Sequence, residues 1–147
     1  MSPTNTEHGE QPGPILIVVT IGWIILFAYL LLTSDPPDLG PIRLRSFEDP
    51  GHLFGSLLLG FLVFLVIVRG GIRPGRAAFL SLAATLVFLG GLEVLQELRP
   101  GRGYQQLDIQ LNLAGSAAGV ALAWIFDRIR RNRQRQVREH PPQPSSD

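Results

Sequence analysis

Carboxylate, amide and guanidinium side chains gather between residues 93 and 112, at spacings that could support chemistry. Glu93 and Gln96 are three residues apart, so they share one face of a helix. Asp108 and Asn112 follow a Pro-Gly turn and, four residues apart, share one face of the next helix. The side chains that we expect to meet there belong to Glu93, Gln96, Arg99, Arg102, Asp108 and Asn112. In such a group Glu93 or Asp108 can transfer a proton, and either arginine can stabilise an anion.

A second polar group lies in the segment from Glu48 to His52. Asp49 followed by Pro50 is typical of a helix N-terminus, with the aspartate as the cap and the proline at the first helical position. This explanation leaves out Glu48 and His52, and we expect His52 to begin a helix at the membrane surface, where its charge can change near neutral pH. The three histidines lack the spacing of the common metal motifs, so the sequence predicts neither a metal nor a cofactor.

The same residues also permit a purely structural interpretation. Glu93 and Arg102 can form an ion pair that fixes the hairpin, and Asp108 can cap the helix that follows. Asn112 favours a functional interpretation, because a polar side chain one turn into an apolar segment is costly and tends to mark a functional site.

Four long apolar segments must position these polar residues. The first, residues 15–32, has eighteen positions without a charge, which as a helix spans about 27 Å, close to the hydrocarbon thickness of a bilayer. The whole chain is 46% hydrophobic and 17% charged, and four such segments in 147 residues leave no polar face for water. We therefore predict an all-α fold, a four-helix transmembrane bundle. Its helices are expected at about 14–33, 51–68, 76–98 and 108–127.

The predicted transmembrane domain, residues 14–127, lies between two polar tails. Residues 1–13 contain Pro and Gly and are predicted to be disordered. Residues 128–147 are basic and are predicted to begin as an extension of the fourth helix that frays into a disordered tail. The basic tail directly follows an apolar helix and has no aromatic residues among its arginines. This pattern favours anionic lipid headgroups over nucleic acid as its partner. The chain has no Cys, which excludes disulfides and Cys-based metal sites.

The distribution of arginines predicts the orientation in the membrane. Four spans place both termini and the turn at 69–76 on one side, with nine arginines, and leave four arginines on the other side. Because cytoplasmic segments carry the excess of basic residues, we predict that both termini are cytoplasmic. The polar groups at 48–52 and 93–112 then face outward.

Gly115 and Gly119 continue the helix face that begins with Asp108 and Asn112. Two glycines four residues apart let the backbone of another helix approach closely. The sequence therefore predicts that the fourth helix packs along these two glycines.

Together these motifs resemble the VanZ-like family of small bacterial membrane proteins. Residues 93–119 carry, in order, E-x-x-Q, P-x-R and D-x-x-x-N-x-x-G-x-x-x-G. The family's D-K-x-x-H element corresponds to Glu48 through His52, with Asp49 at the basic position. The resemblance covers about residues 15–126. It implies a multi-pass protein of the bacterial cytoplasmic membrane and a family link to resistance against the glycopeptide teicoplanin, but it supplies no reaction.

Three hypotheses about function follow from the sequence. The first is a non-enzymatic envelope protein whose outward polar residues bind a lipid-linked or peptide-like ligand. The second is a membrane enzyme that acts on a lipid headgroup or a cell-wall precursor. The third is a structural or assembly protein in which the polar residues only hold the helices together. A pocket joining the two polar groups favours the first two hypotheses, and a closed ion-pair network favours the third.

Overall fold

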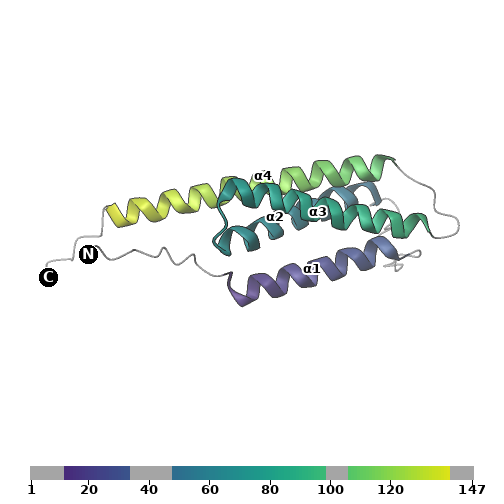
Figure 1. The fold of residues 1–147 in the computed structure, drawn as a ribbon, viewed down its shortest axis with the longest axis horizontal. Helices are drawn as coiled ribbons and strands as arrows, with labels where there is room; N and C mark the ends of the chain where they lie inside the picture. Colours follow the sequence, from purple (N-terminus) through teal and green to yellow (C-terminus); the bar gives the residue numbers. More distant parts are fainter. Residues whose placement is uncertain (1–11, 34–47, 99–105, 140–147) are drawn as a thin grey trace, which may run out of the picture.

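The computed structural model describes residues 12–33, 48–98 and 106–139, and all regular structure within them is helical. The helices are α1 (Pro14–Leu32), α2 (Glu48–Arg69), α3 (Pro74–Glu97) and α4 (Gln106–Glu139). They lie side by side, each antiparallel to the next along the chain (Figure 1). Each is long and apolar enough to cross a membrane. The prediction of an all-α bundle with four membrane-spanning helices is confirmed.

Proline and glycine set the boundaries around the short turn between α2 and α3. Pro74 occupies the first turn of α3, where its missing N–H has no intrahelical acceptor to lose. Gly71, just after α2, has a φ of 87°, which L side chains rarely adopt. The turn is therefore tight, and α3 returns directly alongside α2.

Glycines allow α2 and α4 to pack against each other more closely than side chains would permit. A Cβ at Gly119 would overlap the carbonyl group of Leu57, and a Cβ at Gly115 would overlap the Ser56 hydroxyl. From the other side, a Cβ at Gly60 would lie 2.6 Å from the backbone oxygen of Ser116. This close contact holds the first turns of α2 and α4 next to each other.

Two apolar clusters fill the rest of the bundle. One joins α2, α3 and α4 through Phe64, Leu65, Val68, Ala77, Val120 and Ala123. The other joins α1 to α2 and α3 through Phe27, Leu31, Leu59, Leu89 and Leu92. At this second contact the indole N–H of Trp23 donates a hydrogen bond to the carbonyl of Gly55, at 3.1 Å. The helix α1 therefore lies against α2 and α3.

The starts of α2 and α4 differ from the predictions. We expected Asp49 to cap α2 and considered Asp108 as a cap of α4, but α2 begins at Glu48 and α4 at Gln106. Both aspartates therefore lie inside the first turn. A proline at residue 50 is compatible with this, because the first N–H groups of a helix have no intrahelical partner. Asp108 also gains from the positive end of the helix dipole.

The fourth helix, predicted to end near residue 127 and to fray beyond it, continues without a break through residues 128–139 of α4. This segment has neither Gly nor Pro, and its Arg, Gln and Glu residues are good helix formers. Extending an existing helix also avoids the cost of nucleation. Residues 140–147, and all but the last two of residues 1–13, lie outside the described residues.

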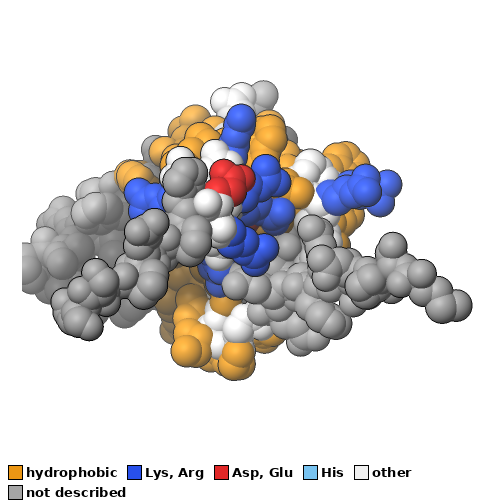
Figure 2. All heavy atoms as spheres, turned by 90° about the vertical axis from the view of Figure 1, so that its left-hand side faces the viewer, with side chains coloured by type: hydrophobic (Ala, Val, Ile, Leu, Met, Phe, Trp, Pro, Cys, Tyr) orange, Lys and Arg blue, Asp and Glu red, His pale blue; other side chains and the backbone are white. Residues whose placement is uncertain are grey.

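All nine arginines in the described residues lie at one end of the bundle (Figure 2). Three surround the α2–α3 turn, and six lie on the last part of α4. With 34 residues α4 is about 51 Å long, whereas a bilayer's hydrocarbon core is about 30 Å thick. The basic part of α4 therefore extends beyond the apolar layer.

Candidate functional site

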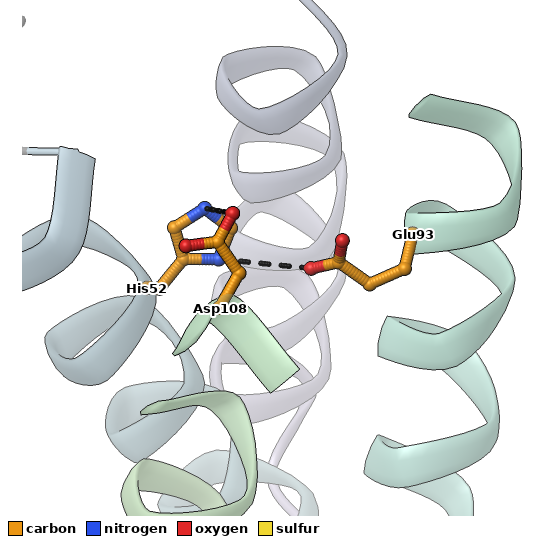
Figure 3. A group of neighbouring side chains, drawn as sticks. All are labelled: His52, Glu93 and Asp108. Atoms are coloured by element: carbon orange, nitrogen blue, oxygen red, sulfur yellow. Dashed lines mark ion pairs between the residues drawn. The ribbon is translucent and has the colours of Figure 1, made fainter. Parts of the chain in front are cut away.

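Four polar side chains meet at the end of the bundle opposite the arginines. We call His52, Glu93, Asp108 and Asn112 the polar cluster. His52 lies in the second turn of α2, Glu93 near the end of α3, and the other two in the first turns of α4. Figure 3 shows the imidazole of His52 between the carboxylates of Asp108 and Glu93. Three helices thus contribute to one group of side chains.

Short distances connect every member of the polar cluster. The Nε2 atom of His52 lies 3.6 Å from Oδ2 of Asp108, and its Nδ1 atom lies 3.9 Å from Oε1 of Glu93. The side chain of Asn112 contacts both His52 and Glu93. Its Nδ2 donates a hydrogen bond to Glu93 Oε1 at 3.1 Å, and its Oδ1 lies 3.4 Å from His52 Nδ1.

The polar cluster is largely shielded from the surface. His52 and Asn112 are each 3% exposed and Asp108 is 5% exposed. The Glu93 side chain is 16% exposed and the Asp108 side chain 7%, so Glu93 is the more accessible of the two carboxylates. Buried polar groups of this kind are costly unless they are paired, so the arrangement requires close mutual contacts or a bound partner.

A groove between α3 and α4 reaches the polar cluster. It encloses a cavity of about 170 Å³. Its walls are formed by Leu86, Leu89, Gly90, Glu93, Val94, Glu97, Ile109 and Asn112. Most of these residues are apolar, and two belong to the polar cluster. The groove therefore combines an apolar wall with a polar end.

Gln96 lies apart from the polar cluster, although it shares a helix with Glu93. It is buried, and its Nε2 donates a hydrogen bond to the backbone oxygen of Leu31 at 2.6 Å. This bond ties α3 to the end of α1. We expected Gln96 to join the ligand-binding residues. Its side chain instead contacts α1, because residues three apart on a helix do not point in quite the same direction and Glu93 faces α4.

The structure describes no side chain for three other expected site residues. Arg99 and Arg102 fall between α3 and α4, in the segment that is not described, so the Glu93–Arg102 ion pair stays a prediction. Glu48 begins α2, and nothing is described of its side chain. The described part of the site is acidic, and it favours cations or hydrogen-bond donors over bare anions.

Two buried polar residues, Ser56 and Asp127, were not predicted from the sequence. Ser56 is fully buried, and its hydroxyl donates to the backbone oxygen of His52 at 2.6 Å, which supports the start of α2. In the sequence, Ser56 could have been identified because it lies four residues, about one helical turn, after His52. Asp127, near the basic end, is buried and accepts a hydrogen bond from Arg131 Nε at 2.7 Å.

Comparisons with known proteins do not extend this description. No family model, curated protein or solved structure matches the chain.

Proposed function

We propose that this membrane protein binds a lipid-linked or peptide-like ligand of the bacterial cell envelope. The observation that carries the proposal is the apolar groove between α3 and α4, which ends at Glu93 and Asn112 of the polar cluster. An amphiphilic ligand has the matching division, with an apolar chain for the groove walls and a polar end for the cluster. Glu93 accepts hydrogen bonds and Asn112 both donates and accepts them, which fits the amide and amine groups of a peptide-like headgroup.

We further propose that the polar cluster faces the outside of the bacterial cytoplasmic membrane. The support is the separation of charge, with nine described arginines at the opposite end of the bundle. The positive-inside rule assigns that end, and with it both termini, to the cytoplasm. The resemblance to the VanZ-like family supports the same location and carries the family's link to teicoplanin resistance.

An enzymatic function is the alternative that one observation favours. The imidazole of His52 lies between two carboxylates, at 3.6 and 3.9 Å, and such groups exchange protons readily. A headgroup bound at Glu93 would lie next to this set. The reaction would then be the modification or hydrolysis of a lipid headgroup or cell-wall precursor, with Glu93 or Asp108 as acid or base.

Lipid retention tests the binding proposal. The full chain is purified from its native membrane in mild detergent, and copurifying lipids are quantified by mass spectrometry. Glu93→Gln removes the accessible carboxylate, and Gly90→Leu adds an apolar side chain to the groove wall, at a position where a Cβ meets nothing within 4 Å. The matched controls are Gly91→Leu, where space is equally open but no groove wall is altered, and Asp127→Asn at the other end.

The proposal expects one lipid class to be enriched in wild type and in both controls, and depleted in Glu93→Gln and Gly90→Leu. Equal lipid content in all five proteins would leave only the structural role of the polar cluster. Accumulation of the intact lipid on Glu93→Gln, with a converted form on wild type, would instead favour the enzymatic alternative.

A further inference from the structure

His52, Glu93 and Asp108 have the arrangement of a metal-binding set. One nitrogen or oxygen atom from each lies within 4.8 Å of the others. Ligands at about 2.0–2.2 Å from a tetrahedral ion lie about 3.3 Å apart. The 3.6 Å between His52 Nε2 and Asp108 Oδ2 is close to that separation. Other separations in the set reach up to 4.8 Å, so the side chains must close by up to about 1.5 Å to share one ion.

Hydrogen bonding by Asn112 determines which nitrogen of His52 is available. A carboxylate only accepts hydrogen bonds, so the amide nitrogen of Asn112 faces Glu93, and its oxygen faces Nδ1 of His52. This oxygen also only accepts, so it suits an N–H at Nδ1. Nε2 faces the carboxylate of Asp108 at 3.6 Å, where either a proton on Nε2 or a metal ion can bridge the two groups. Metal-bound histidines typically have their second nitrogen hydrogen-bonded in this way.

Charge and access also agree with a metal ion. The two carboxylates carry two formal negative charges, so a divalent ion makes the set of three ligands neutral in a poorly solvated region. The groove at Glu93 and Asn112 leaves room for a further ligand, such as water or a headgroup oxygen. Three protein ligands with one open position distinguish reactive or ligand-binding metal sites from closed structural ones.

We propose that His52, Glu93 and Asp108 bind one divalent transition-metal ion. Mixed imidazole and carboxylate ligands favour zinc or manganese over magnesium or calcium, which prefer oxygen alone. Asn112 acts as a positioning residue, because it orients both the imidazole and the Glu93 carboxylate. The inference is independent of the lipid ligand proposed above, since the ion alone is the probe.

The test uses the full chain in detergent, purified through a tag that binds no metal and freed of metal with a chelator. Zinc or manganese chloride is then added, and bound metal is measured by elemental mass spectrometry and titration calorimetry. We expect one ion per chain in wild type. Binding should weaken at least about tenfold in His52→Gln, Glu93→Gln and Asp108→Asn, which preserve side-chain volume.

Matched controls separate this site from other ligands in the chain. Asp127→Asn changes a buried carboxylate on the same helix as Asp108, and Glu139→Gln changes an exposed one at the end of that helix. Replacing both other histidines, His8 and His140, by Ala tests whether the two tails bind the metal. All these variants should bind zinc or manganese as wild type does.

Two results would overturn the metal site. One is wild-type protein that takes up no stoichiometric metal, a measurement that needs no variant to fold. The other is binding that survives in folded His52→Gln but is lost when His8 and His140 are replaced. Lipid retention measured on the same samples keeps the two proposals distinct, because either can fail while the other holds.

Discussion

Asp108 and Asp127 are buried carboxylates on the same helix, at opposite ends of the bundle. Asp127 is paired with Arg131, one turn later on α4, at 2.7 Å. Asp108 lies 3.6 Å from His52, which belongs to α2 and is 56 positions away in the chain. One aspartate has a partner that helix geometry supplies locally. The other has a partner that exists only because two helices pack together.

This difference separates a structural ion pair from a candidate site. The Arg131 side chain is 47% exposed, so the pair with Asp127 sits at the edge of water and carries its own neutralising charge. The polar cluster instead combines two acids with an imidazole that can be neutral. It also borders a groove, and these features together make it a candidate site.

The largest effect should come from separating α2 and α4. In Gly119→Leu the new side chain meets the backbone of α2 at Leu57, and overpacking of this kind costs up to about 3 kcal/mol. We expect a lower melting temperature in detergent and loss of metal binding, while the local Asp127–Arg131 pair persists. Gly22→Leu is the control, because nothing lies within 4 Å of its Cβ position. Wild-type stability of Gly119→Leu would mean that this face of α4 does not pack on α2.

A smaller loss is expected when the imidazole is removed. His52→Ala leaves Asp108 and Glu93 without the group between them, and an unsatisfied buried polar group costs about 1–3 kcal/mol. Chemical or thermal unfolding in detergent measures this loss. Phe54→Ala, on the same helix but 65% exposed, should have little effect on the free energy of unfolding. Equal effects of the two substitutions would contradict a special role for His52.

The smallest loss of stability is expected from a substitution at the arginine-rich end of the bundle. Asp127→Asn removes a pair between residues four apart on one helix, worth about 0.5 kcal/mol when one partner is half exposed. Because the pair is electrostatic, the difference from wild type should shrink at high salt. A loss as large as that of His52→Ala, measured under the same conditions, would remove the contrast between the two ends.

The orientation of the bundle can be tested with almost no effect on stability. The chain has no Cys, so single cysteines report cleanly. Leu98→Cys lies at the end of the bundle that holds the polar cluster. Gln134→Cys lies at the opposite, arginine-rich end, and both positions are exposed. A membrane-impermeant thiol reagent should label Leu98→Cys in intact cells, and Gln134→Cys only after permeabilisation. The reverse pattern would place the polar cluster in the cytoplasm.

Local sequence accounts for where the helices form. Long charge-free segments predict spans because their length matches a bilayer. The four-residue spacing of Asp127 and Arg131 pairs them because α4 continues past residue 127, although this pair was not among our predictions. Exact helix ends were less predictable. Asp49 and Asp108 resemble caps, yet they lie one and two residues after the first residue of their helices, since the first turn accepts Pro and Asp almost as readily as the cap position does.

Tertiary structure decided which polar residues share a site. Glu93 and Gln96 lie three apart on α3, yet Glu93 contacts α4 and Gln96 bonds to α1, because a residue's angle around its own helix does not specify which neighbour it meets. The set of His52, Glu93 and Asp108 draws one side chain from each of three helices, so no local spacing reveals it. Their meeting depends on the rotation and depth of each helix, which the glycine contact between α2 and α4 and the packing of α3 establish together.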